Sequence, residues 1–448
     1  MAIKFEHYNS NMTSIESKLK DISAALDKGS LPLGVFNDDM IFALEKKTIF
    51  SRSWNFLGHT SEIPMPGDYM QRYVVDDAFI VTRDENDDIH VLLNACRHRG
   101  RQVCRAEKGN TKSFTCPYHG WVYAINGNLM DVHCMEEIYA KEEFDKNKWG
   151  LVPAPRFAIW RDWIFANLDE NAEDLEDYLG DAIWYLDFYT NKTPGGLEVH
   201  GVPQRWVVNA DWKLAADNFV GDGYHTFITH ASTIEAGSLP AQDGDFLKDG
   251  VQVVLENFGI GFARQDPMFN SLAYPPDMFE SIKKRLNPEQ RAVLDNNVSL
   301  PTHGNLFPNL SFLNAPGGFT RQAPPAPYMT FRVWRPLAAG RTEIWSWCLV
   351  EKDADEAFKQ ACYKAYVISF GASGTLEQDD AENWMTISKA AKGTMAGELM
   401  LNYAMGEKQL EPMSDWPGPG KAYPMDYTEF AQRAFWRKWL CMLEAKSS

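Results

Sequence analysis

Two histidines and two further polar residues stand close together in the stretch 211–230, which reads DWKLAADNFVGDGYHTFITH. They are Asn218, Asp222, His225 and His230. Two imidazoles and a carboxylate are the ligands of non-haem Fe(II) sites that keep positions open for O2. The stretch therefore predicts an iron site, with Asn218 and Asp222 as candidate catalytic residues. Taken alone, it fits equally well a helix end that carries ordinary buried histidines.

The spacing of the two histidines constrains the backbone. At about 100° per residue, His225 and His230 would point about 140° apart on a straight helix, so they could not bind one ion from there. Asp222 and His225, three residues apart, could share a face. We therefore expect a helix that ends near Gly221 and then a break, permitted by Gly221 and Gly223, that turns both imidazoles inward.

A second set of metal-binding residue types lies upstream, in NACRHRGRQVCRAEKGNTKSFTCPYHGW. Cys96 and His98 form a Cys-x-His pair, and Cys116 and His119 form a Cys-x-x-His pair. Two such pairs can hold a two-iron cluster in which one iron takes both thiolates and the other both imidazoles, the Rieske [2Fe–2S] arrangement. A structural zinc site also accepts two cysteines and two histidines, although this order differs from the common zinc spacings.

Composition bounds the class of protein. The 448 residues include 15 Trp and 26 Phe, which suits two or three domains with a large core. The net charge of −17 argues against nucleic acid and anionic membranes as partners. The sequence has no bilayer-length apolar stretch and no signal-peptide core, so we expect a cytoplasmic protein with reduced thiols. The remaining cysteines are interpreted as packing residues: Cys104, Cys134, Cys348, Cys362 and Cys441.

The first third of the chain predicts two helices followed by a mostly β region. Helices are expected at 12–28 and 37–50, the second capped by Asn37. Alternating apolar residues and the Asn126-Gly127 turn signal then predict a β domain over 53–172. Its strands are expected at 69–75, 78–83, 89–96, 156–160 and 163–168, with a hairpin around Asn126.

The remainder predicts an antiparallel sheet covered by helices, so the fold class is α+β. Strands are expected at 198–208, 251–255, 258–264, 303–313, 328–336 and 342–350. Helices are expected at 173–187, 211–221, 276–294, 353–369, 374–390 and 426–442. Residues 411–424, rich in Pro and Gly, are expected to form a surface loop.

With both motifs in hand, the chain resembles the large (α) subunit of Rieske non-haem iron aromatic-ring-hydroxylating dioxygenases, of the naphthalene and polycyclic-aromatic type. The resemblance runs through LEKKTIFSRSWNFLGH, the two Cys/His loops, NFVGDGYHTFITHAS and GTLEQDDAENW. It implies N-terminal helices (1–52) that pack on the catalytic domain, a Rieske domain (53–172) and a catalytic mononuclear-iron domain (173–448).

The resemblance also implies the ligand sets. Cys96, His98, Cys116 and His119 would hold the [2Fe–2S] cluster. The mononuclear Fe(II) would be bound by His225, His230 and the second aspartate of the acidic run Glu377–Asp380, which is Asp380. The residues alone would favour a solvent-facing acidic helix there. Adjacent carboxylates point about 100° apart on a helix, so only one of Asp379 and Asp380 can face the iron.

In the family, a carboxylate at the position of Asp222 links a Rieske histidine of one α subunit to an iron ligand of its neighbour. Here that implies a bridge from His119 or its surroundings to His225, with Tyr118 hydrogen-bonded to the carboxylate. A helix-terminal cap is the other interpretation of Asp222. The resemblance further implies five substrate-pocket residues: Phe219, Phe227, His303, Phe370 and Leu376. Leu376 replaces a larger aromatic of the naphthalene-type enzymes.

The function implied by the resemblance is a terminal oxygenase that adds both atoms of O2 to an aromatic, polycyclic hydrocarbon and yields a cis-dihydrodiol. Electrons would come from a ferredoxin and an NAD(P)H-dependent reductase. A small β subunit in an α3β3 assembly is implied as well. The metal motifs equally suit a Rieske monooxygenase or demethylase. A protein of another class, a Rieske electron carrier without oxygenase activity, would need only the two Cys/His pairs.

Overall fold

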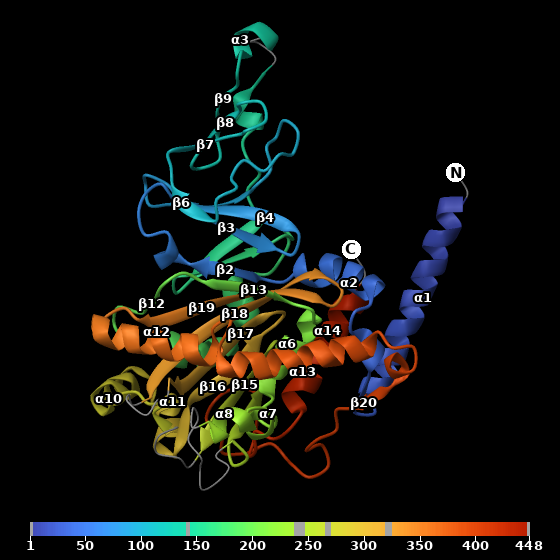
Figure 1. The fold of residues 1–448 in the computed structure, drawn as a ribbon, viewed down its shortest axis with the longest axis vertical. Helices are drawn as coiled ribbons and strands as arrows, with labels where there is room; N and C mark the ends of the chain where they lie inside the picture. Colours follow the sequence, from blue (N-terminus) through green and yellow to red (C-terminus); the bar gives the residue numbers. More distant parts are fainter. Residues whose placement is uncertain (1–2, 140–143, 237–246, 265–269, 319–324, 446–448) are drawn as a thin grey trace. The chain divides into compact units, whose positions relative to one another are not determined.

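The computed structural model describes residues 3–139, 144–236, 247–264, 270–318 and 325–445, with side chains from residue 15 onward (Figure 1). The chain divides into two compact units. One combines Met1–Ile49 with Leu179–Ser448, and the other is Phe50–Tyr178. No helix in the described parts of the chain has the length and apolarity to cross a membrane.

The unit Phe50–Tyr178 consists mainly of short antiparallel strands. They form three sheets with the orders β10-β11-β2, β5-β4-β3-β6 and β7-β8-β9. The elements are β2 (Asn55–His59), β3 (Asp68–Val74), β4 (Asp77–Arg83), β5 (Ile89–Leu93), β6 (Lys108–Asn110), β7 (Ser113–Thr115), β8 (Val122–Ala124), β9 (Leu129–Asp131), α3 (Met135–Ile138), β10 (Arg156–Trp160) and β11 (Trp163–Asn167). The expected hairpin is present between β8 and β9, where Gly127 adopts φ +88°.

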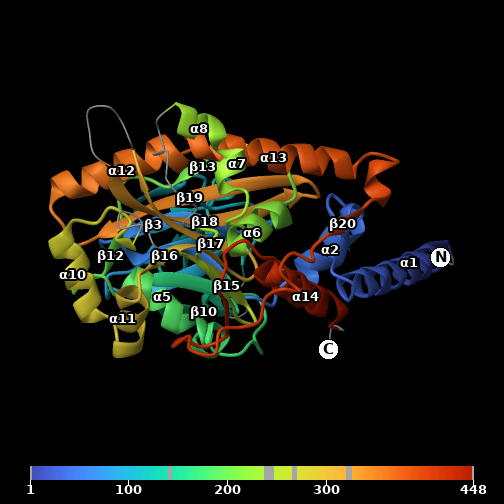
Figure 2. The same ribbon diagram turned by 90° about the horizontal axis from the view of Figure 1, so that it is seen from below.

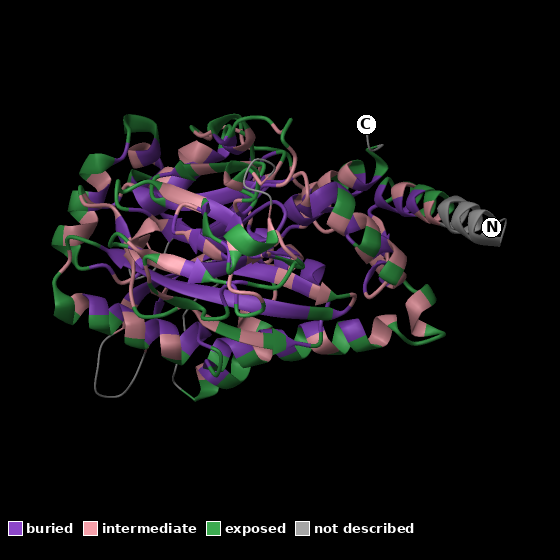
Figure 3. Cartoon of the chain, turned by 90° about the horizontal axis from the view of Figure 1, so that it is seen from above, coloured by how far each residue is buried: buried purple, intermediate pink, exposed green. Residues whose placement is uncertain are grey.

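The other unit is built on a nine-stranded antiparallel sheet, in the order β12-β19-β18-β17-β16-β15-β14-β21 with β13 also paired to β19. Its strands are β12 (Leu197–Val199), β13 (Gln204–Val208), β14 (Val251–Val254), β15 (Phe258–Arg264), β16 (Val298–Leu306), β17 (Leu310–Gly317), β18 (Ala326–Ala338), β19 (Arg341–Glu351) and β21 (Lys421–Tyr423). A separate pair joins β1 (Ser30–Pro32) to β20 (Met400–Asn402). The long strands of the nine-stranded sheet, among them β16 and β19, are buried over most of their length (Figure 3).

Helices lie on both faces of this sheet. The helices of this unit are α1 (Ile3–Leu26), α2 (Asp39–Glu45), α5 (Ala182–Thr190), α6 (Trp212–Gly221), α7 (Thr226–Thr229), α8 (Ala231–Glu235), α10 (Pro276–Arg285), α11 (Pro288–Asp295), α12 (Glu356–Phe370), α13 (Thr375–Ala391) and α14 (Phe430–Glu444). The short helix α4 (Leu175–Leu179) contains the boundary between the two units, after Tyr178. The fold class predicted from the sequence, α+β with a mostly β domain near the N-terminus and an antiparallel sheet covered by helices, is confirmed.

Side chains that alternate along β18 identify the helices on each face of the sheet. Phe331 contacts Tyr189 of α5, with ring centroids 6.4 Å apart. Trp334, on the opposite face, packs against Phe219 of α6 at 5.1 Å and Trp384 of α13 at 5.5 Å. Figure 2 shows α13 along one side of the sheet and α5 on the other. The residues expected to bind iron lie on or near α6 and α13, and therefore on one face.

Several expected elements are divided in the structure. The helix expected at 276–294 is two helices, because Pro288 disfavours helical backbone at the preceding residue and Asn287 caps α11 in a capping box with Gln290. The strand expected at 303–313 is the end of β16 and the start of β17. The segments 173–187 and 198–208 are likewise divided, into α4 with α5 and β12 with β13.

Two smaller expectations were wrong. The helix α2 is capped by Asp38, whose carboxylate accepts the backbone N–H groups of Met40 and Ile41, both at 2.9 Å, and not by Asn37. The expected loop 411–424 contains the edge strand β21, which pairs with β14. A three-residue strand is too short for a periodic pattern to mark it in the sequence.

Candidate functional site

Two similar turns carry the Cys/His pairs of the smaller unit. The backbone N–H of Gly100 donates to Cys96 O at 2.8 Å, and that of Gly120 donates to Cys116 O at 3.0 Å. Both glycines have positive φ, +74° and +72°, which other residues adopt only at a cost. The glycines therefore close the two loops, and each loop presents one cysteine and one histidine.

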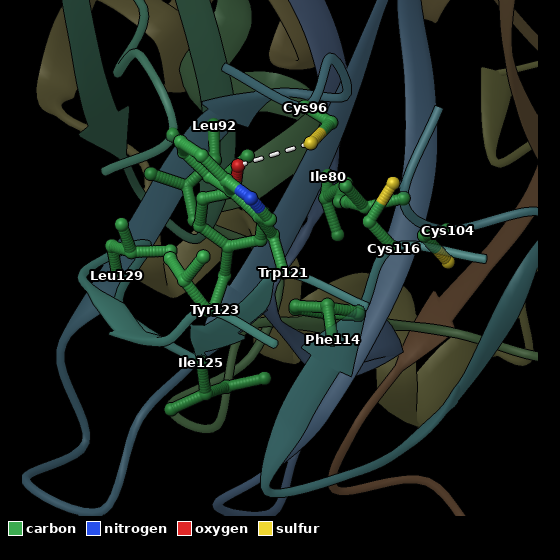
Figure 4. Packing of buried hydrophobic residues seen from close by; sticks show 13 residues of the cluster. Ile80, Leu92, Cys96, Cys104, Phe114, Cys116, Trp121, Tyr123, Ile125 and Leu129 are labelled. Atoms are coloured by element: carbon green, nitrogen blue, oxygen red, sulfur yellow. Dashed lines mark hydrogen bonds between the residues drawn. The ribbon is translucent and has the colours of Figure 1, made fainter. Parts of the chain in front are cut away.

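The four side chains converge between the two loops. The rings of His98 and His119 lie 4.6 Å apart, and their Nδ1 atoms are buried without a hydrogen-bond partner among the described residues. Cys96 and Cys116 are buried, and Cys96 Sγ lies 3.2 Å from the hydroxyl of Tyr123 (Figure 4). Two unpartnered imidazole nitrogens beside two buried thiols are donors that fit a [2Fe–2S] cluster with two ligands on each iron.

The other five cysteines do not all pack as expected. Cys104, Cys348 and Cys362 are buried, but Cys134 and Cys441 are exposed. Cys134 has φ +53° at the start of α3, and its Sγ lies 3.3 Å from Nε2 of His133. The interpretation of Cys134 and Cys441 as packing residues was therefore wrong.

A buried network of charges fixes the start of α6. Asp211 caps the helix by accepting the backbone N–H of Lys213 at 3.1 Å. The ammonium of Lys213 lies 2.8 Å from Asp211 and 2.9 Å from Glu45. Glu45 also accepts the indole N–H groups of Trp212 at 2.9 Å and Trp439 at 2.8 Å. Because every charge has partners, this burial is tolerated and α6 is anchored to α2 and α14.

The backbone breaks after α6 where the sequence predicted. The helix ends at Gly221, and one short helix, α7, separates His225 from His230. This arrangement brings the two imidazole rings to 5.5 Å between centroids. A straight helix would have turned the rings apart.

Asp380 of α13 completes a group of three. Its Oδ1 lies 3.4 Å from Nε2 of His225 and 3.4 Å from Nε2 of His230. One ligand atom from each of the three residues lies within 4.8 Å of the other two, which suits a single ion bound by two imidazoles and a carboxylate. Asp379 lies instead 3.2 Å from Nδ1 of His230, the ring nitrogen that faces away from Asp380.

The acidic run on α13 is not the solvent-facing surface that its composition suggests. Glu377 and Asp380 are 1% and 2% exposed. Glu377 pairs with the buried guanidinium of Arg332, which also donates to the backbone oxygen of Phe370. Arg332 thereby ties the end of α12 to the first turn of α13, and this contact positions Asp380 one turn later.

Asp222 contacts His225 from the other side. Its carboxylate lies 3.2 Å from His225 Nδ1 and accepts hydrogen bonds from the backbone N–H of His225 at 3.1 Å and from Asn218 Nδ2 at 3.1 Å. Desolvation raises the pKa of Asp222, but the His225 imidazole and these hydrogen bonds outweigh it, so the pKa is lowered. Asp222 is therefore an ionised carboxylate against the back of a candidate ligand.

All five residues expected in the substrate pocket line one cavity of about 120 Å³. The same cavity is lined by the three candidate iron ligands and by Asn218 and Asp222. The remaining wall is mainly apolar and includes Leu247, Leu313, Ala315 and Tyr328. No sequence motif marks these four residues, which reach the cavity only through the pairing of strands and the packing of loops.

Tyr118 is 57% exposed in the smaller unit, and its ring centroid lies 3.7 Å from that of His119. It follows Cys116 by two residues on the second Cys/His loop. The residue is thus exposed at the surface beside one of the two candidate cluster histidines, as an intermolecular contact of that loop would require.

Comparison with known proteins agrees with this geometry. Residues 53–145 match the Rieske [2Fe–2S] domain, and residues 175–440 match the catalytic domain of ring-hydroxylating α subunits. The first match excludes a structural zinc site at the Cys/His loops. The second excludes a Rieske electron carrier that has no catalytic domain.

Relatives match over almost the whole chain. The N,N-dimethyl phenylurea N-demethylase subunit alpha of Sphingobium sp. (strain YBL2) is 36% identical and covers 95% of this chain and 94% of its own. Biphenyl 2,3-dioxygenase subunit alpha of Rhodococcus jostii (strain RHA1) is 34% identical, and the match covers 94% of this chain and 91% of that protein. The crystal structure of naphthalene 1,2-dioxygenase from Rhodococcus sp. bound to indole has a TM-score of 0.89 at 43% identity. The match covers 95% of this chain and 98% of the chain in that structure. The chain belongs to the family of ring-hydroxylating α subunits, which combine a Rieske [2Fe–2S] domain with a mononuclear-iron catalytic domain.

Proposed function

We propose that this chain is the catalytic subunit of an oxygenase that adds both atoms of O2 to an aromatic, polycyclic hydrocarbon and forms a cis-dihydrodiol. The observation that supports this most is the position of His225, His230 and Asp380 on the wall of an apolar cavity. The three side chains would hold Fe(II), and the cavity would hold the arene beside it. Bound in this way, Fe(II) supplies O2 activation from its open coordination positions.

The protein's own residues orient the ligands. Asp222 would keep His225 in the tautomer with a proton on Nδ1, because its carboxylate accepts from that nitrogen and leaves Nε2 free to bind metal. Asp379 would do the same for His230. Each imidazole would then donate its Nδ1–H to a carboxylate, which is how metal-bound histidines are usually oriented.

The cavity favours an apolar substrate. Apolar surface comes from Phe219, Phe227, Phe370 and Leu376. The cavity volume of about 120 Å³ is similar to that of engineered apolar cavities of roughly 150 Å³, which bind benzene. Naphthalene and biphenyl, which appear in the names of two relatives, are substrates of the class that such a wall would accept. Leu376, smaller than an aromatic residue, would leave extra room at one side.

Electrons would enter through the cluster held by Cys96, His98, Cys116 and His119, supplied by a ferredoxin and an NAD(P)H-dependent reductase. Asp222 would carry them onward by accepting hydrogen bonds from His225 and from a Rieske histidine of a neighbouring α subunit, with Tyr118 donating to the same carboxylate. Two features support this proposal. The side chain of Asp222 is 30% exposed although it holds His225, and Tyr118 is exposed beside His119. A small β subunit in an α3β3 assembly completes the proposal.

A demethylase or monooxygenase activity is the second candidate. It is favoured by the N-demethylase subunit of Sphingobium, which is 36% identical to this chain over nearly its whole length. A test of both activities supplies the purified protein with a reconstituted ferredoxin and reductase chain. It is then assayed on mono-, bi- and tricyclic arenes and on N-methylated phenylureas. We expect cis-diols from the bicyclic or tricyclic arenes; formaldehyde from the ureas with no diol from any arene would replace the first proposal with the second.

A further inference from the structure

Asp426, between β21 and α14, is a carboxyl group with no exposed surface. Neither of its oxygens has a hydrogen-bond partner among the described residues. An ionised carboxylate held away from water without such partners costs several kcal/mol, on the order of the stability of a whole domain. The mechanism above does not use this group, and its state therefore needs an explanation.

His303, on β16, lies next to it. The Nδ1 atom of His303 lies 3.0 Å from Thr302 Oγ1, and that hydroxyl lies 3.0 Å from the backbone oxygen of Gly261. A hydroxyl has one proton, and a carbonyl oxygen can only accept, so the proton of Thr302 goes to Gly261. Thr302 must then accept from His303 Nδ1–H, which leaves Nε2 of a neutral imidazole as a hydrogen-bond acceptor.

Both groups are held in their uncharged forms. Burial, together with the nearby His225, lowers the pKa of His303 to about 4. Burial and the charge of Asp222 raise the pKa of Asp426 well above its ordinary value, against a smaller opposite effect of His225. At neutral pH the first group is a bare acceptor and the second has a proton to donate.

The two unpartnered atoms face each other, with His303 Nε2 3.8 Å from Asp426 Oδ1. We propose that Asp426 is a neutral carboxylic acid that donates its proton to Nε2 of His303 and so fixes the tautomer and orientation of this wall of the substrate cavity. A small rotation of either side chain closes the distance to that of a hydrogen bond. One such bond gives a partner to His303 Nε2 and to one oxygen of Asp426 without burying a charge.

The backbone around the pair is shaped to leave it room. Gly261 of β15 lies directly opposite His303 in the sheet, and a Cβ there would come within 2.2 Å of the imidazole and 2.8 Å of Asp426 Oδ1. A Cβ on Gly223, in the break between α6 and α7, would come within 2.3 Å of Asp426 Oδ2. Neither glycine has a positive φ, so the need for glycine here is one of space and not of backbone conformation.

Asp426 is thus a positioning residue that acts through His303, a lining residue of the cavity. An uncharged, fixed imidazole edge suits an apolar arene, whereas an imidazolium or a freely rotating ring would not. The pairing itself stands on the contacts of the two residues. Its consequence for the product rests on the proposed function.

The first test reads the protonation state directly and needs no turnover. Infrared difference spectra of wild-type protein and Asp426→Asn at neutral pH, in H2O and D2O, isolate this one carboxyl group. We expect the carbonyl stretch of a protonated carboxylic acid in the wild-type protein, shifted in D2O and absent from the variant. A difference spectrum that contains only carboxylate bands would overturn the proposal, whatever the enzyme's substrate proves to be.

The second test compares two substitutions whose side chains have the same number of non-hydrogen atoms and the same branching. Asp426→Asn keeps an N–H that can donate to His303 Nε2, whereas Asp426→Leu removes the donor. With equal iron content in both, we expect Asp426→Asn to keep the wild-type ratio of product isomers and Asp426→Leu to change it. If both variants change the ratio of product isomers by the same amount, a negative charge on Asp426 matters and not a proton donated to His303, and the proposal is overturned. If Asp426→Leu does not fold, Thr302→Val, which removes the acceptor for His303 Nδ1, takes its place with the same expectation.

Discussion

Asp222 holds His225 through two contacts: Oδ1 accepts the backbone N–H at 3.1 Å, and Oδ2 lies 3.2 Å from the ring Nδ1. The same carboxylate is 30% exposed. A group that only capped α6 would need neither the ring contact nor the exposed edge. The geometry therefore suits a carboxylate that joins a metal-bound imidazole to something outside the subunit.

Asp222→Asn should uncouple the two metal sites. The amide is nearly isosteric but lacks the charge that makes hydrogen bonds to carboxylates about twice as strong as neutral ones. We expect both metals to stay bound and turnover to fall by at least about 10–100-fold. The measurement is single-turnover oxidation of the reduced cluster with substrate and O2, alongside iron analysis. Cluster oxidation at the wild-type rate would remove the bridge, and loss of mononuclear iron would make Asp222 a ligand.

Asp380 and Asp379 should differ in their effect on iron. Asp380→Ala should lose the mononuclear iron and all oxygenation while the paramagnetic resonance signal of the reduced cluster stays. Asp379→Ala, the matched control, removes the contact to His230 Nδ1 and a long hydrogen bond from Thr233 Oγ1. It should keep iron at saturating concentration with affinity weaker by about 10–100-fold. The reverse result in iron titrations would exchange the roles of the two aspartates.

The sequence identified the candidate metal-binding residues more readily than the residues around them. The Cys/His loops could be identified because four ligands and two glycines lie in 25 consecutive residues, from Cys96 to Gly120. The choice of Asp380 over Asp379 depended on resemblance, since composition alone favoured a solvent-facing helix. In the structure the candidate ligand Asp380 is buried, and the buried contact of Arg332 with Glu377 lies one turn earlier. Residues 45 positions apart come together only when β18 and α13 pack.

The same limit applies to Asp426. Nothing near it in the sequence resembles a functional motif, and its contacts come from β15, β16 and the break after α6. The divided helix at 276–294 is different, because the Asn287-Pro288 pair was a readable signal for a boundary.

Leu376→Trp should narrow the cavity, since Leu376 lines it and is 7% exposed. We expect a changed ratio of product isomers or exclusion of tricyclic arenes, with iron content unchanged. Leu376→Met, which nearly conserves volume, should behave like the wild type. An identical product distribution for Leu376→Trp across several arenes would place this side chain outside the space that substrate occupies.

His303 should make the protein sensitive to mild acid. Its pKa is lowered to about 4 in the folded protein, against about 6.5 in an unfolded chain. Between these values the unfolded state binds the additional proton, so stability falls as pH drops from about 6.5 to 4, by up to about 1.4 kcal/mol per pH unit. The free energy of unfolding of wild type and of His303→Asn can be measured with denaturant. The difference between the two should shrink as the pH falls across this range. A difference independent of pH would mean that His303 is not held neutral.

The central claim is that both atoms of one O2 reach an arene bound beside His225, His230 and Asp380. The most direct measurement is mass spectrometry of the product formed from a bicyclic arene under ¹⁸O2, in H2¹⁶O, with the reconstituted electron-transfer chain. The account predicts a cis-dihydrodiol in which both hydroxyl oxygens are ¹⁸O. A product with one labelled oxygen, or a dealkylated product with no diol from any arene, would contradict it.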